Sequence, residues 1–248
     1  MKTLAAVILF SASMVFPHAA FAGDANGKPV LLVGMEEHET ENAGRNELFF
    51  QDFIKAFGEK YNYQIKIVEH PVKRLFAEFV KLNLDIKYPD HPKWGEDARK
   101  GLNIVYSDPV VSYREGVLVL PENLGKGLDN LKRLSVIRGF SPWPYMDRVK
   151  SKAVTLVETS NDETAIRMTL LGRADGSYLS QAAADYTQNQ LKLEKKLVFD
   201  TGLPNITDVY YVSTIKHPDV LKQINSFMKE EKAMIEKLKL KHGVQDVK

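Results

Sequence analysis

The chain has 248 residues, 34 Lys and Arg against 32 Asp and Glu, and no Cys. This length suits one large domain or two small ones, and 44% hydrophobic residues are enough to build their cores. A net charge of +2 spread along the chain provides no basic cluster, so we expect no nucleic-acid partner and no membrane-surface binding. The absence of Cys excludes disulfides, thiol nucleophiles, Cys-based metal sites and Cys-linked lipid anchors.

The first residues have the pattern of a secretory signal peptide. Lys2 precedes an apolar run over residues 4–16, which is too short to cross a bilayer comfortably. Small residues at Ala20 and Ala22 then suit signal peptidase. We therefore expect residues 1–22 to be removed and the mature protein to reside in the periplasm. An uncleaved membrane anchor is the alternative.

Strand and helix patterns alternate in the first part of the mature chain. Residues 30–34 form a continuous apolar run, which is typical of a buried parallel strand. Phe49, Phe53 and Phe57 then recur at helical spacing after Asn46, a candidate helix cap. Residues 63–67 alternate as a strand does, and Pro71 opens a second amphipathic helix. The predicted order is β-α-β-α.

The same alternation resumes further along the chain. Additional strands are expected at residues 84–88, 103–106, 116–120, 134–137, 154–157, 174–179, 197–199 and 209–212. Helices are expected to start at Ser141 and Pro142, to follow a cap at Ser160 or Asn161, and to cover residues 181–191, 218–228 and 231–240. This order predicts an α/β fold of mainly parallel sheets flanked by helices, with ligands bound beyond the carboxyl ends of the strands.

The loop after the first strand is rich in acidic side chains. Glu36 and His38 lie in it and are candidates for contact with a ligand. A solvated acidic loop is the alternative, and metal ligation is a further one. No spaced set of His or Asp elsewhere completes a metal site, so none is predicted.

A proline-stiffened loop follows the strand at residues 84–88. Tyr88 and Trp94 are expected to sandwich the apolar body or cationic group of a ligand, and Asp90 to accept hydrogen bonds from it. The alternative is that the two aromatic rings only pack beneath the loop.

A strand-to-helix turn over residues 138–143 offers a site for an anion. Arg138 supplies a full charge, Ser141 a hydroxyl and the helix N-terminus a partial positive charge, so a carboxylate suits it. Plain capping of the helix by Ser141 is the alternative. Trp143 in this turn is expected to line the binding gap together with Trp94.

Signatures of catalysis are missing from the sequence. It has no His-Glu-x-x-His helix, no Gly-x-Ser-x-Gly elbow and no dinucleotide fingerprint. We therefore expect a protein that is not an enzyme and carries no cofactor.

Several short stretches, in their order along the chain, make this sequence resemble periplasmic solute-binding proteins of the polar-amino-acid family, which is solute-binding protein family 3. The stretches are Val33-Gly34, Val68-Glu69-His70-Pro71, Leu84-Asp85-Ile86, Tyr106-Ser107-Asp108-Pro109, Gly172-Arg173-Ala174-Asp175 and His217-Pro218-Asp219-Val220-Leu221. The resemblance implies a two-lobe type II architecture with two hinge crossings. Residues 23–108 and 207–248 would form lobe one, and residues 109–206 lobe two.

The resemblance also implies positions for the ligand-binding residues. Members that bind amino acids carry an Arg before the Ser-Asp-Pro crossing, and Arg99 or Lys100 stands nearest to that place here. An acid for the α-ammonium group follows the Gly-Arg-x-Asp strand in the family, and Ser180 stands near that position here. The usual amino-acid clamp is therefore incomplete.

An alternative mode of ligand binding uses polar and charged groups on both lobes. Asp90 and Glu36 in lobe one, with Arg138 and Ser141 in lobe two, would suit a ligand with separated positive and negative groups.

The resemblance implies a monomeric binding protein that delivers a small polar, amino-acid-like ligand to the membrane permease of an ABC transporter. Two alternatives remain open. One is a sensory module read by a membrane receptor, and the other is an enzyme similar to periplasmic cyclohexadienyl dehydratases. The enzyme would need a buried acid of raised pKa, for which Glu36 and Asp90 are the candidates.

Overall fold

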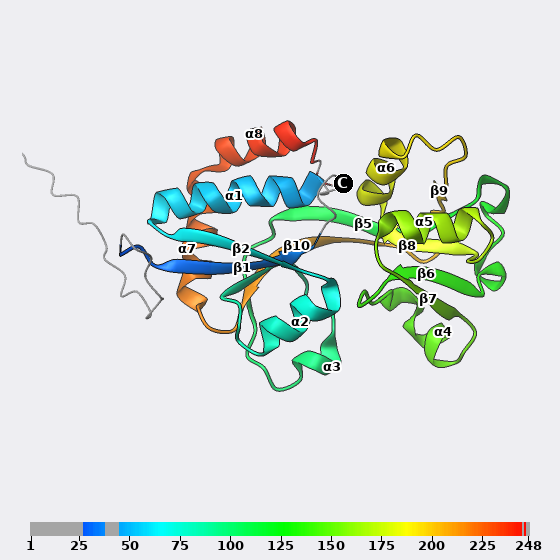
Figure 1. Ribbon diagram of the computed structural model, residues 1–248, viewed down its shortest axis with the longest axis horizontal. Helices are drawn as coiled ribbons and strands as arrows, with labels where there is room; N and C mark the ends of the chain where they lie inside the picture. The colour runs from blue at the N-terminus through cyan, green and yellow to red at the C-terminus, as the bar shows by residue number, and fades with distance from the viewer. Residues whose placement is uncertain (1–26, 38–44, 245, 247–248) are drawn as a thin grey trace, which may run out of the picture.

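Two α/β halves lie end to end along the long axis of the molecule and share a mixed 10-stranded sheet (Figure 1). The computed structural model describes residues 27–37, 45–244 and 246. The predicted signal peptide and His38 lie outside these residues. The sheet order along its main path is β2-β1-β3-β10-β5-β8-β6-β7.

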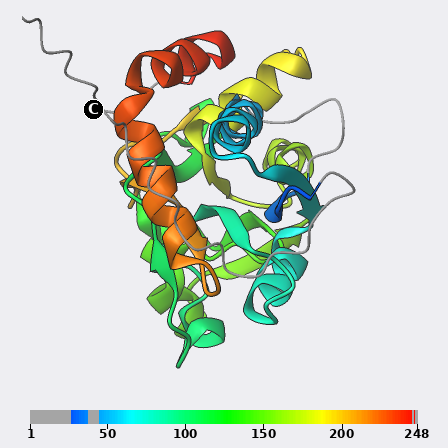
Figure 2. The same cartoon turned by 90° about the vertical axis from the view of Figure 1, so that its left-hand side faces the viewer.

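The first half is built on three parallel strands. β1 (Val30–Glu36) lies between β2 (Gln64–His70) and β3 (Ile86–Asp90). The helices α1 (Arg45–Tyr61), α7 (Pro218–Glu230) and α8 (Lys232–His242) pack together against one face of these strands (Figure 2).

The phenylalanine stripe of α1 is completely buried on that face, as its helical spacing predicts. On the opposite face α2 (Val72–Val80) buries Leu75 and Phe79 against Leu84. The short helix α3 (Glu96–Arg99) and strand β4 (Val105–Tyr106) follow β3 along the chain.

The second half repeats this plan with three parallel strands of its own. β6 (Arg133–Ile137) lies parallel to β7 (Thr155–Thr159) and β8 (Gly176–Ser180). α5 (Asp162–Leu170) and α6 (Gln181–Gln190) cover one face, while α4 (Met146–Lys150) lies on the other (Figure 1). The two-residue strand β9 (Val198–Phe199) pairs with β5.

Two long antiparallel strands join the halves. β10 (Ile206–Thr214) pairs with β5 (Val111–Val119) up to Tyr210, and from Tyr211 onward it pairs with β3 and β4. β5 pairs on its other edge with β8 of the second half. The α/β class and the two-lobe architecture are therefore confirmed, and the predicted lobe boundaries near residues 108 and 206 stay predictions.

Most of the predicted elements are present. Pro71 precedes α2, and the Asn161 side chain accepts a hydrogen bond from the Thr164 backbone N–H (2.9 Å), which identifies Asn161 as the cap of α5. The capping role suggested for Ser141 is wrong, because a 3₁₀ turn at Trp143–Tyr145 begins after Pro142 and receives no side-chain cap. In the described part of the chain, no helix is long and apolar enough to span a bilayer.

Candidate ligand-binding site

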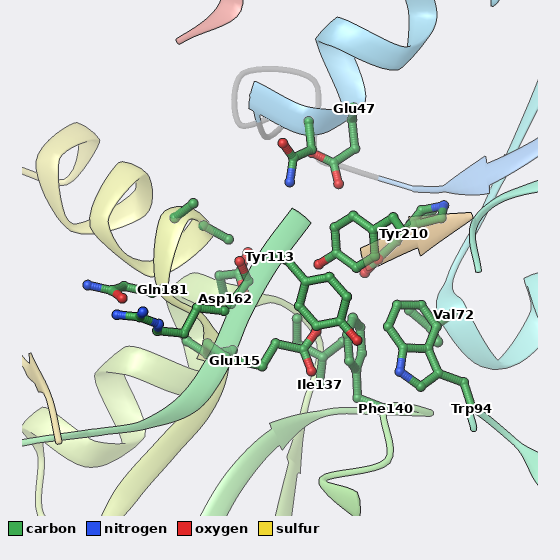
Figure 3. Close-up of a pocket in the computed structure, with 18 of the residues that line it drawn as sticks. Glu47, Val72, Trp94, Tyr113, Glu115, Ile137, Phe140, Asp162, Gln181 and Tyr210 are labelled. Atoms are coloured by element: carbon green, nitrogen blue, oxygen red, sulfur yellow. The ribbon is translucent and has the colours of Figure 1, made fainter. Parts of the chain in front are cut away.

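A cavity of about 360 Å³ lies between the two halves, and both halves contribute to its wall (Figure 3). Lobe one supplies residues of the β1 end, α1, α2 and the loop after β3, while lobe two supplies the ends of β6 and β8 and the first turn of α6. This position agrees with the expectation that ligands bind beyond the carboxyl ends of parallel strands.

Aromatic rings line much of the cavity. Trp94 lies with its ring centroid 6.2 Å from that of Tyr113, 5.7 Å from Tyr210 and 6.4 Å from Phe140. Tyr113 and Tyr210 stack face to face at 4.1 Å. The neighbouring strands β5 and β10 hold these two tyrosines, so the rings lie where the halves meet.

Glu115 on β5 is a carboxyl group buried beside these rings. Only 3% of the residue is exposed, and the Tyr178 hydroxyl donates a hydrogen bond to Oε2 at 3.3 Å. Burial raises the pKa of Glu115 to about 7, and the negative charge of Asp208 adds to the effect while the tyrosine hydrogen bonds oppose it. Glu115 is therefore held near the midpoint of its titration at neutral pH.

A second buried charged group lies beneath lobe one's side of the cavity. Asp90 is completely buried and accepts hydrogen bonds from the Lys87 ammonium (3.1 Å), the Arg99 guanidinium and the Ser213 hydroxyl. Lys87 also donates to the Pro89 carbonyl oxygen at 2.7 Å.

Burial alone raises the pKa of Asp90, but the two cations outweigh it and hold the pKa below its usual value. Burial in turn lowers the pKa of Lys87. The three groups thus satisfy one another inside the protein.

The halves also touch each other at the rim of the cavity. Gly139 after β6 approaches α2 so closely that a Cβ built on it would lie 2.9 Å from the Lys73 backbone nitrogen. The Lys93 ammonium lies 4.5 Å from the centroid of the Trp143 ring. Val72 of α2 joins the apolar cluster that contains Ile137. Lobe one and lobe two are therefore in direct apolar and backbone contact around the site.

Four of the residues proposed from the sequence line the cavity, namely Glu36, Trp94, Ser141 and Ser180. They come from both lobes, so the structure brings together positions that are more than a hundred residues apart. Their contact with a ligand remains a prediction.

Six other proposed residues do not line the cavity. Tyr88 is buried in the core of lobe one and stacks on Phe50 at 3.6 Å, as the alternative of packing beneath the loop requires. Asp90 and Arg99 are paired with each other beneath the cavity, and Lys100 is exposed at the end of α3.

Arg138 and Trp143 lie on lobe two away from the lining. Arg138 is exposed, with its Nε 3.5 Å from a Glu158 carboxylate oxygen, and Trp143 packs against the core of lobe two. The expected anion site at residues 138–143 therefore does not face the cavity as a unit, because only Gly139, Phe140 and Ser141 of this turn reach it.

Sequence patterns do not indicate the lining residues of β5 and β10. Tyr113 and Glu115 precede the strand predicted at residues 116–120, and Tyr210 lies within the strand predicted at residues 209–212, with no functional signal of its own. A carboxylate next to an apolar run, at Glu115, was the available signal, since a charge inside a central strand requires a partner or a function.

Metal-ligating clusters are absent from the described residues. In that part of the chain, no group of three or more acidic or His side chains is placed to hold an ion.

Comparison with known proteins identifies the fold. No protein-family model matches the chain, and no curated protein matches it. Among solved structures, a mutant of ArgBP from T. maritima is 21% identical, with a TM-score of 0.68 over 86% of this chain and 95% of that one.

Two further structures are similar. A histidine kinase sensor domain with similarity to periplasmic binding proteins is 16% identical, with a TM-score of 0.72 over 89% of this chain and 99% of its own. The ancestral amino acid-binding protein AncCDT-1, a precursor of cyclohexadienyl dehydratase, is 18% identical, with a TM-score of 0.63 over 86% of this chain and 94% of its own. This chain therefore has the fold of the periplasmic binding proteins.

Proposed function

We propose that this protein is a periplasmic solute-binding protein that captures a small polar, amino-acid-like ligand between its two lobes and delivers it to the permease of an ABC transporter. The observation that supports this proposal is the cavity of about 360 Å³ whose wall is shared by the two halves. Cavities of this size are typical of sites for small organic molecules.

The two-strand connection explains how binding would be transmitted. A ligand that contacts both lobes favours the conformation in which the lobes lie close together, by as much free energy as the contacts unique to that conformation provide. In this proposal the permease recognises the conformation in which the two lobes lie close together. The protein acts as an exported monomer after cleavage following Ala22.

A stability panel tests the capture of a ligand. Purified protein starting at Gly23 is heated with single compounds from a panel of amino acids, organic amines and small carboxylates. A compound at a hundredfold excess over its Kd raises the free energy of unfolding by about 2.7 kcal/mol. If no compound of the panel raises the free energy of unfolding, the proposal is contradicted.

The sensor alternative is favoured by the similarity to the histidine kinase sensor domain. Transport and sensing differ in the membrane protein that receives the closed form. Uptake of the bound compound by cells that lack this protein discriminates them: transport predicts loss of uptake, and sensing predicts that uptake continues.

The enzyme alternative is favoured by Glu115, because a buried carboxylic acid of pKa about 7 is suited to protonate a leaving hydroxyl group. Asp90 is unsuited to that role, since its pKa is lowered rather than raised. Incubation with prephenate or arogenate tests this alternative, and product formation that Glu115→Gln abolishes would favour it over simple binding.

A further inference from the structure

The charges on the cavity wall are predominantly negative. Among the described residues that line the cavity, five are acidic and two are basic. The acidic residues are Glu36, Glu47, Glu115, Asp162 and Asp185, and the basic residues are Lys87 and Arg114. Such a wall favours a cation over an anion of the same size.

Both basic residues have partners within the protein. Lys87 is 1% exposed and donates to the Pro89 carbonyl and to Asp90, and its ammonium lies 4.3 Å from the centroid of the Phe76 ring. Arg114 donates from Nε to the Thr207 hydroxyl oxygen at 3.3 Å. Lys87 is therefore not available as a clamp for a ligand's carboxylate, which needs an accessible fork of donors, whereas the hydrogen bond of Arg114 engages its Nε and not its Nη groups.

In the described part of the chain, the side-chain donors to Glu115 are tyrosine hydroxyl groups. Tyr178 of β8 and Tyr210 of β10 supply them, and Asp208 of β10 adds a second negative charge nearby. His91 lies 3.1 Å from Asp208 and is paired with that residue. Among the described residues, no Lys, Arg or His forms an ion pair with Glu115. A buried carboxylate without a cation is costly, so a cationic ligand would remove that cost.

Ring faces lie on the same side of the cavity as this carboxyl group. In Figure 3 the Glu115 side chain extends from β5 toward the rings of Tyr113 and Phe140, with Trp94 next to them. The faces of such rings attract an ammonium group, and their area holds an apolar stem. A carboxylate beside several rings is the arrangement that recognises an amine attached to an apolar body.

We propose that the cleft selects small organic amines, held by an ammonium group between Glu115 and the rings of Trp94, Tyr113 and Phe140, and that an α-carboxylate on the ligand is not required. This inference rests on the proposed binding function and specifies the ligand class for the same cavity. It differs from recognition of a zwitterionic amino acid, which needs an available carboxylate clamp in addition.

Matched pairs of compounds test the selection. Calorimetric titration at pH 8 compares agmatine with arginine, tyramine with tyrosine, and phenethylamine with phenylalanine, because the members of each pair differ only in the α-carboxylate. We expect the amine of at least one pair to bind ten times more tightly than its parent amino acid or better. Parents that bind as tightly as their amines, or more tightly, would overturn the proposal.

A variant tests the role of Glu115. Glu115→Gln keeps the size and the hydrogen-bonding capacity of the side chain but removes its charge, so we expect at least a tenfold weaker affinity for the amine. Glu122→Gln, on an exposed residue of the same lobe paired with Lys195, is the matched control and should bind as the unaltered protein does. Equal affinity of Glu115→Gln and the control would overturn the assignment of Glu115.

Different outcomes of these titrations contradict the binding function and the selection of amines. Binding of an amino acid without its amine would disprove the selection of amines and leave the solute-binding function intact. The absence of binding by every amine and every amino acid would disprove both.

Discussion

The environment of Glu115 differs strongly from that of an exposed carboxyl group. Its pKa of about 7 compares with an ordinary value of 4.5, because burial between the hinge strands disfavours its charged form. A raised pKa in the folded state stabilises the fold at pH below 4.5, and that contribution is lost as the pH rises through 7.

Stability should therefore fall with pH more steeply in the unaltered protein than in Glu115→Gln. From pH 5 to pH 8, the unfolding free energy of the unaltered protein should fall by on the order of 3 kcal/mol more than that of Glu115→Gln. Denaturant unfolding of both proteins across this range measures it. His91, whose burial lowers its pKa, contributes to both curves and cancels in the difference. Parallel curves for the two proteins would contradict the assignment.

Ligand affinity should depend on pH in the opposite sense. An ammonium group binds the ionised form of Glu115, so the affinity for an amine should rise toward pH 7 and level off above it. Titration at pH 5.5, 6.5 and 8 measures this dependence. The Glu115→Gln variant should lack it, and a pH-dependence that persists in the variant would assign the titration to another group.

Asp90 stabilises the wall of the site from beneath. Its replacement in Asp90→Asn leaves the buried Lys87 and Arg99 cations without their shared carboxylate. Breaking a buried ionic group in this way costs about 3–5 kcal/mol of folding free energy. Chemical denaturation measures the loss, and Asp129→Asn, which removes an exposed partner of Arg148, should cost less than about 1 kcal/mol. A loss of less than about 1 kcal/mol for both variants would show that the buried group of Asp90, Lys87 and Arg99 adds little to the folding free energy.

At the scale of the elements, the turn after β6 contacts α2 through Gly139. This glycine has a φ of +96°, in the left-handed region, and its α-carbon faces the Lys73 backbone. A methyl group in Gly139→Ala would push lobe two away from α2, so we expect a weaker affinity for the ligand, by about tenfold.

Gly172→Ala is the matched control for this variant. Gly172 also has a positive φ, of +66°, but a Cβ there would meet no atom within 4 Å. Both variants should lose about 1–2 kcal/mol of stability from backbone strain, and only Gly139→Ala should lose affinity. Equal affinity in the two variants would show that the contact between the turn and α2 does not contribute to binding.

The same elements show what the sequence predicts and where it fails. The helix spacing of Phe49, Phe53 and Phe57 and the Asn161 cap depend on neighbours a few residues away, so both were predictable. The pairing of β10 with β5 in one half and with β3 in the other depends on residues a hundred positions apart, and local patterns do not contain it.

The candidate site illustrates the same limit. Trp94 and Ser141 were located because they follow strands in an α/β order, which fixes the side of the sheet on which they lie. Tyr88 was misplaced because alternation along a strand does not tell which face of the sheet is the cavity and which is the core. The omission of Glu115 has a different cause, because Glu115 lies before the predicted strand at residues 116–120, whereas β5 begins at Val111.

At the scale of the whole molecule, the halves should move relative to each other around β5 and β10. Binding to both walls stabilises the closed arrangement, so a saturating ligand should reduce the radius of gyration in solution scattering. An unchanged radius of gyration, together with ligand bound at full occupancy, would exclude closure as the signal to a membrane partner.

The central claim is that one small ligand occupies the cavity between the lobes. The most direct measurement is calorimetric titration of the tightest compound of the panel into the unaltered protein, Ala183→Trp and Gln190→Trp. Ala183 of α6 lines the cavity, so a Trp there fills it, whereas Gln190 lies exposed at the end of the same helix and away from the lining. We expect one ligand per chain in the unaltered protein and in Gln190→Trp, and no binding to a folded Ala183→Trp. Undiminished binding by Ala183→Trp would contradict the account.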